Sequence, residues 1–250
     1  MRMVRVTVVL LFGFALALSG QDEKEAEEKK REPQKPAATL DIKNSKEGSY
    51  PGGSTPIAGK WSVDAGAKKL KVGEVPLVRG KIEFGPEIRE KGATIIASGR
   101  APGDGRLKSR IGVGLYGKNG FQLRLVMTRN EIELVRRGIV LAAAPADLDT
   151  EPLFEMELSV LEDEEDWQVS GRVWKTNAPR PKEPMIACKA ITAELLFPLA
   201  GRPSLIATPF SGEPVQFAAG RVYYGAYEPP EKDSEKDSEK DSEKDSEKDS

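Results

Sequence analysis

The segment IGVGLYGKNGFQLRLVM at residues 111–127 decides the fold. Apolar side chains alternate on both sides of Asn119-Gly120, so every second residue points to the same side of a strand. Asn-Gly is a frequent hairpin turn, because both residues tolerate a positive φ. Further turns at Arg129-Asn130 and Arg137-Gly138 lead into EIELV and IVL. The segment therefore predicts an antiparallel meander of about four strands.

The same alternation continues downstream. Residues 154–160 place apolar side chains on one face and Glu155, Glu157 and Ser159 on the other, which predicts a strand with a core face and a solvated face. Residues 167–174 return in strand register, with Trp167 and Trp174 on opposite sides. Closing strands are expected near Ile186, Leu195, Leu205, Val215 and Val222. About ten or more short strands predict an all-β, antiparallel β-sandwich.

The first residues have the layout of a signal peptide. Basic Arg2 and Arg5 precede an apolar run that ends before small residues, and we expect cleavage near Gly20. A retained membrane anchor is the alternative, but the run is shorter than the roughly 20 apolar residues that span a bilayer. We therefore predict a secreted or periplasmic protein of the bacterial cell envelope, with no membrane span after cleavage.

Composition divides the rest of the chain. Residues 21–56 are charged or rich in Pro and Gly, and they predict a mostly disordered linker. Residues 57–228 carry the alternating pattern of the sandwich. Residues 229–250 end in five copies of Glu-Lys-Asp-Ser, a low-complexity repeat with no apolar face, which predicts a disordered tail.

Two absences limit the chemistry. The chain has no histidine, which removes the usual general base and the usual zinc and haem ligand. Cys188 is the single cysteine, so no internal disulfide forms, and we expect it to be a small buried hydrophobe. No cofactor and no metal are expected. Residues 36–230 have a net charge of +2, too little for the basic field of a nucleic-acid binder.

The order of several motifs resembles that of a known family. The motifs are GLYGKNGFQLRL at 114–125, EIELV at 131–135, GRVW at 171–174, GRP at 201–203 and FSGEPVQF at 210–217. Together they resemble concanavalin A-like (laminin G-like) jelly-roll domains of bacterial secreted proteins, over roughly residues 59–227. The resemblance implies a two-sheet jelly roll whose relatives mostly bind carbohydrate or serve as accessory modules, with some glycoside hydrolases. Similar domains often carry acidic residues where this chain has Ala218-Ala219, so no calcium site is expected there.

Two other motifs indicate a structural role more than a ligand-binding one. Gly112, Gly114 and Gly117 have the spacing of a dinucleotide fingerprint, but a hairpin follows them and not a helix, so we expect glycines that let strands pack closely. The acidic run at 162–166 lacks the spaced ligands and the Gly of a calcium loop, so we expect a loop tip.

Paired acids and a few aromatics are the candidate site residues. Glu131 with Glu133, and Glu155 with Glu157, could act as glycosidase carboxylates, but their alternation with core residues favours a solvated face over catalysis. An aromatic platform for a sugar ring could form from Trp174, Tyr223 and Tyr224, with core packing as the competing interpretation.

We therefore predict a non-enzymatic β-sandwich module that binds carbohydrate or has a structural role. One alternative is a glycoside hydrolase-like enzyme, which would need two acids facing each other across a concave sheet. The other alternative is a module of the cell envelope that binds a protein partner.

Overall fold

The computed structural model describes residues 33–73, 78–102, 108–146, 153–164, 166–191, 195, 198–210 and 213–230. The predicted signal peptide, the first part of the predicted linker and the Glu-Lys-Asp-Ser repeats lie outside the described residues. Within the described ranges every regular element is a β-strand. Accordingly, this part of the chain contains no helix of the length and apolarity that crossing a membrane requires.

The first sheet has eight strands, and seven of them follow the order β13-β12-β11-β6-β15-β4-β3, while β1 pairs with β15. Every pairing in it is antiparallel. The strands are β1 (Ala38–Thr39), β3 (Trp61–Asp64), β4 (Lys69–Val72), β6 (Gly92–Arg100), β11 (Phe154–Asp163), β12 (Asp166–Lys175), β13 (Ile186–Ile191) and β15 (Val215–Tyr224).

The second sheet has seven antiparallel strands in the order β10-β9-β8-β7-β14-β5-β2. The predicted meander is confirmed, because β7, β8, β9 and β10 pair in sequence order. The strands are β2 (Ser54–Ala58), β5 (Gly80–Phe84), β7 (Arg110–Leu115), β8 (Phe121–Val126), β9 (Glu131–Arg136), β10 (Ile139–Pro145) and β14 (Ser204–Thr208).

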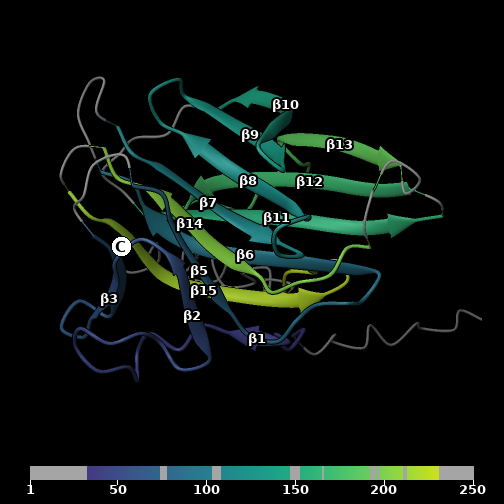
Figure 1. The fold of residues 1–250 in the computed structure, drawn as a ribbon. Coiled ribbons are helices and arrows are strands. Elements are labelled where there is room, and N and C mark those ends of the chain that lie inside the picture. The colour runs from purple at the N-terminus through teal and green to yellow at the C-terminus, as the bar shows by residue number, and fades with distance from the viewer. Residues whose placement is uncertain are drawn as a thin grey trace, which may run out of the picture. The chain divides into compact units, whose positions relative to one another are not determined.

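The core lies between the two sheets. Figure 1 shows β7, β8 and β9 layered over β6, β11 and β12. A Cβ on Gly171 of β12 would lie 2.6 Å from Cδ1 of Leu123 on β8, so the two layers are closely packed there. The Tyr116 ring meets the Trp167 ring edge-on at 5.8 Å between centroids. The predicted antiparallel β-sandwich is therefore confirmed.

The turn between β7 and β8 differs in detail from the prediction. The positive φ values belong to Tyr116 (60°) and Gly117 (63°), and neither Asn119 nor Gly120 has one. Gly120 is needed for another reason, since a Cβ there would lie 1.9 Å from the carbonyl oxygen of Leu115. The hairpin is present, but its connection is longer than the two-residue turn typical of Asn-Gly.

The folded part begins before residue 57, where we placed the boundary. Leu40 and Ile42 are buried in the core, and β1 pairs with β15. An isolated bridge joins Asp41 to Gly52. Two apolar residues in a polar stretch are too short a pattern to identify as a strand, which is why the sequence predicted a linker here.

The closing strands are partly as expected. Ile186 and Leu205 lie in β13 and β14. Val215 and Val222 share the single strand β15, which has a register shift between Phe217 and Ala219. Leu195 lies in none of the strands. β15 pairs with β4 on one edge, at its start, and with β6 along the other edge.

Candidate functional site

The four candidate acids lie on two different sheets. Glu155 and Glu157 lie on β11 of the first sheet, and Glu131 and Glu133 lie on β9 of the second. In both strands the alternate apolar residues belong to the core between the sheets. Each acidic pair therefore points away from that core, on the outer face of its own sheet. The structure does not bring the two pairs together.

The sequence predicted that Glu157 lies on a solvated face. In the structure Glu157 is buried and only 1% exposed. Nη1 of Arg172 donates to its Oε1 at 2.6 Å. Nε of Arg180 donates to its Oε2 at 2.5 Å, and Nη2 donates to Oε1 at 2.6 Å. The prediction was wrong because guanidinium groups from β12 and from the loop after it cover this face. Both carboxylate oxygens are occupied, so Glu157 stabilises the fold here.

Glu155 is half-buried between Ser98 and Trp174, its partners on the two neighbouring strands. Its Oε2 has no hydrogen-bond partner among the described residues. Burial raises the pKa of its carboxyl, and the positive charge of Arg221 opposes that rise. A carboxyl with a raised pKa is what a general acid requires, but its neighbour Glu157 is already held by arginines.

Glu131 and Glu133 are both bound by one arginine. Nε of Arg129 lies 3.1 Å from Oε2 of Glu131, and Nη2 of Arg129 forms an ion pair with Glu133. Glu133 is 5% exposed, because Arg124 of β8 and Ala143 of β10 lie beside it in the sheet. This pair is therefore also engaged in ion pairs and only partly solvated.

The three candidate aromatics do not form one surface. Trp174 on β12 and Tyr223 on β15 are separated by two strands, β11 and β6. Tyr223 is 3% exposed, and the Tyr227 ring lies 4.6 Å from it between centroids. Tyr224, at the end of β15, is 42% exposed. Their placement gives no shared flat platform for a sugar ring.

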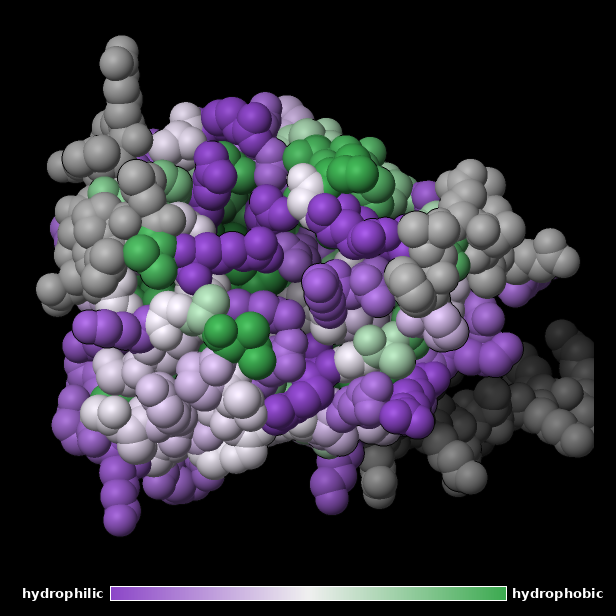
Figure 2. Space-filling model, viewed as in Figure 1, coloured by the Kyte–Doolittle hydropathy of each residue, from purple (hydrophilic) through white to green (hydrophobic). Residues whose placement is uncertain are grey.

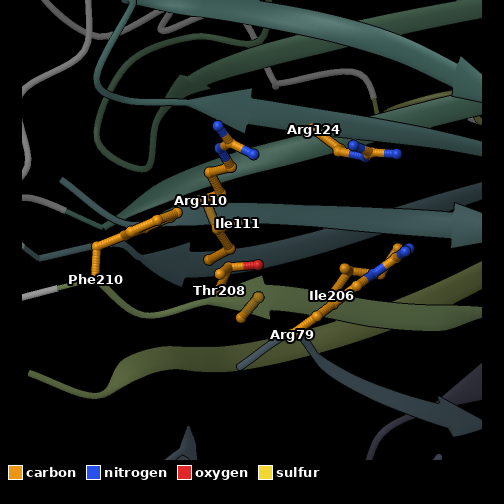
Figure 3. A pocket seen from close by; sticks show the side chains of 8 residues that line it. Arg79, Arg110, Ile111, Arg124, Ile206, Thr208 and Phe210 are labelled. Atoms are coloured by element: carbon orange, nitrogen blue, oxygen red, sulfur yellow. The ribbon is translucent and has the colours of Figure 1, made fainter. Parts of the chain in front are cut away.

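A pocket on the outer face of the second sheet was missed by the sequence analysis. Its volume is about 260 Å³. Figure 2 shows hydrophilic side chains gathered around small hydrophobic areas on the face of the molecule seen in Figure 1. In Figure 3 the side chains of Arg79, Arg110, Arg124 and Phe210 lie on different sides of one space, with Thr208 between them. The lining residues are Arg79, Arg110, Ile111, Arg124, Ile206, Ala207, Thr208 and Phe210.

Strand register positions these side chains. Gly112 of β7 lies between Arg124 of β8 and Ile206 of β14, so all three share one row across the sheet. Gly112 has no side chain to fill the space between the other two. A Cβ on it would lie 2.4 Å from the carbonyl oxygen of Leu123, so close strand packing also requires glycine here.

Three of the side chains that line the pocket are positively charged. Within the described ranges, none of Arg79, Arg110 and Arg124 forms an ion pair with a carboxylate. Arg79 and Arg124 both donate to Oε1 of Gln122, at 3.0 and 3.3 Å. The Arg110 guanidinium lies 5.5 Å from the centroid of the Phe210 ring. Burial lowers the pKa of Arg124, and the charge of Arg79 lowers it further.

The sequence offered only one signal for this pocket. Arg110 and Arg124 alternate with core residues of the meander, so an outward direction could have been inferred for both. Arg79 and Phe210 come from distant segments, and no local pattern connects them to the meander. Among the described residues, no group of three or more His, Cys, Asp or Glu side chains could hold a metal ion. Burial raises the pKa of the half-buried Cys188 thiol.

No protein-family model and no curated protein matches the sequence. Several solved structures are similar in fold. The metal-free carbohydrate recognition domain of Emp46p has a TM-score of 0.55 at 12% identity, covering 76% of this chain and 97% of that chain. Lectin II from Ulex europaeus has a TM-score of 0.55 at 7% identity, and the match covers 77% of this chain and 100% of the lectin chain. The metal-free exoplasmic/lumenal domain of VIP36 has a TM-score of 0.53 at 9% identity, and the match covers 76% of this chain and 92% of the VIP36 chain.

The described residues thus form a concanavalin A-like jelly roll, as the motif order indicated. At these low identities the likeness is one of fold. The likeness by itself assigns no function to this chain.

Proposed function

We propose that this protein is a carbohydrate-binding module that acts without catalysis, and that the pocket on the outer face of the second sheet is its sugar site. The observation that carries the proposal is the combination of an aromatic ring, Phe210, with the guanidinium groups and the Thr208 hydroxyl around one cavity. Aromatic rings pack against the apolar face of a sugar, while N–H and O–H groups bind its hydroxyls. Two of the similar structures are named as a carbohydrate recognition domain and a lectin, which agrees with this role.

The size of the pocket favours a short stretch of sugar. Its volume of about 260 Å³ is below the roughly 300–1,000 Å³ of pockets for drug-sized ligands. We infer that it holds one residue of a glycan, with the rest of the glycan lying across the sheet.

The hydrolase alternative has less support. A glycosidase needs two carboxyls on opposite sides of the bond that it cleaves. Here Glu157 is held by Arg172 and Arg180, Glu133 is paired with Arg129, and the two acidic pairs lie on different sheets. Binding without catalysis accounts better for this arrangement.

Export to the cell envelope remains part of the proposal. It depends on residues 1–20, which lie outside the described residues. Amino-terminal sequencing of the protein recovered from the envelope or the medium tests it. A mature amino terminus near residue 21 supports export, and an intact Met1 contradicts it.

A glycan array with the full chain tests the binding function. We expect binding to at least one glycan, with loss in the Phe210→Ala variant and retention in the Trp174→Ala variant. The opposite result would move the sugar site to the first sheet, beside Trp174. Binding to no glycan would contradict the carbohydrate function and favour a protein partner.

A further inference from the structure

We propose that the pocket selects an acidic saccharide, whose carboxylate or sulfate group is bound between Arg79, Arg110 and Arg124. This inference rests on the proposed function and adds the chemical class of the sugar. The pocket holds three guanidinium groups, and no carboxylate of the described residues forms an ion pair with them.

The three arginines reach the pocket from three segments. Arg79 directly precedes β5, Arg110 is the first residue of β7, and Arg124 lies in the middle of β8. β7 is adjacent to β8, and β14 lies between β7 and β5, with adjacent strands about 4.8 Å apart. The long side chains bridge this span, since Arg79 and Arg124 both donate to Oε1 of Gln122 on β8. Figure 3 shows their guanidinium groups around the same space. The pocket is thus a place where three long cationic side chains converge.

Their hydrogen bonds leave donors available for a ligand. A guanidinium has five N–H groups. One donor of Arg79 and one of Arg124 are used on the same amide oxygen of Gln122. Arg110 contacts only the face of Phe210 among the interactions of described residues. Most of the N–H groups can therefore bind oxygen atoms of an anion, often two at a time.

Three like charges around one cavity repel one another, and an anion relieves that repulsion. Burial lowers the pKa of Arg124, and the charges of Arg79 and Arg110 lower it further. Among the described residues, Glu133 opposes this effect, but its carboxylate forms an ion pair with Arg129, which does not line the pocket. A bound carboxylate or sulfate would supply the missing negative charge.

The surroundings favour a saccharide over a nucleic acid. Residues 36–230 have a net charge of only +2, so the positive charge is local and does not form the broad field that a polynucleotide requires. Phe210 and Thr208 border the arginines and provide an apolar ring face and a hydroxyl. Ring stacking beside an anion site matches a sugar that bears an acidic group.

Isothermal titration of the full chain with matched saccharides tests the inference. The carboxylate probe is oligogalacturonate, and its neutral counterpart is the fully methyl-esterified oligogalacturonate. The sulfate probe is oligomeric dextran sulfate. Poly-L-glutamate serves as an anion that contains no sugar. We expect oligogalacturonate, dextran sulfate or both to bind at least about tenfold more tightly than the ester and poly-L-glutamate, as a hydrogen bond to a charged group predicts. Which of the two binds identifies the acidic group.

Arginine variants connect that binding to the pocket. Arg110→Gln and Arg124→Gln should each weaken binding of the acidic saccharide about tenfold or more, because each removes a charge-assisted contact. Arg110 is exposed, so its variant should fold normally even if the half-buried Arg124 variant does not. The control is Arg89→Gln, which removes an exposed arginine that pairs with Glu87 away from the pocket and should leave affinity unchanged.

The possible failures are distinguishable. Equal or tighter binding of the methyl ester, or binding of neutral array glycans alone, overturns the acidic preference and leaves the proposed function standing. Equal binding of poly-L-glutamate overturns the selection of a saccharide. An unchanged affinity in both arginine variants removes the site from this pocket. Binding to no saccharide at all contradicts the proposed function itself.

Discussion

Arg180 binds Glu157 through two hydrogen bonds, from Nε to Oε2 at 2.5 Å and from Nη2 to Oε1 at 2.6 Å. These two hydrogen bonds hold the loop after β12 against the outer face of β11. The Arg180 guanidinium also lies 5.7 Å from the centroid of the Tyr227 ring. Arg172 adds a third hydrogen bond to the same carboxylate. One buried acid therefore joins a strand, a loop and the segment after β15.

Glu157→Gln should destabilise the protein by about 3 kcal/mol, because it leaves two largely buried guanidinium groups without their shared anion. Urea unfolding at pH 7 measures the effect. The matched control is Glu87→Gln, which breaks the exposed pair with Arg89 and should cost less than about 1 kcal/mol. Equal losses in the two variants would contradict a structural role for Glu157.

Glu155→Gln should stabilise the protein at pH 7. Burial raises the pKa of Glu155 above its ordinary value of 4.5, so the charged carboxylate is less favourable in the folded chain than in the unfolded chain. The folded state then binds more protons, and stability falls as the pH rises from 4.5 through the raised pKa. Glutamine does not ionise, so its advantage should be present at pH 7 and absent below the ordinary pKa.

Urea unfolding at pH 7 and at pH 4 measures this difference. The control is Glu183→Gln, whose side chain is exposed and should give no gain that depends on pH. A Glu155→Gln variant that is less stable than the parent at pH 7 would show that the attraction to Arg221 outweighs the cost of burial.

Gly171→Ala should destabilise the protein by about 1–3 kcal/mol, as overpacking of a core does. The new methyl would lie 2.6 Å from Cδ1 of Leu123 and 3.0 Å from Cγ2 of Ile186. The control is Gly52→Ala, where nothing lies within 4 Å of the new atom. Thermal unfolding compares the two variants. An unchanged midpoint for Gly171→Ala would mean that the sheets are less closely packed than described.

Ile42→Ala should cost about 2–5 kcal/mol, the range for truncating a buried aliphatic side chain. Ile42 is 2% exposed in the core, whereas Ile57, the control, is 54% exposed. Chemical unfolding of Ile42→Ala and Ile57→Ala tests whether the segment before residue 57 belongs to the fold. If both variants unfold like the parent, that segment contributes no stability.

The sequence predicted the meander well because β7 to β10 are neighbours both in the chain and in the sheet. It predicted the environment of Glu157 wrongly, since the arginines that bury this carboxylate come from β12 and a loop. It placed Trp174 and Tyr223 in one candidate platform, but β11 and β6 lie between their strands. Alternation shows which side of a strand a residue occupies, but it does not show what covers that side.

The amino-acid sequence alone determined the class of fold, because alternation with a period of two is a local property that any strand carries in its own residues. Tertiary structure alone decided the pocket. In the order β8-β7-β14-β5, β14 pairs with β7 and β5, which lie far from it in the chain, and this pairing brings Arg124, Arg110 and Arg79 to one cavity. Long-range pairing depends on how whole sheets bury their apolar faces, and no short stretch of sequence contains that information.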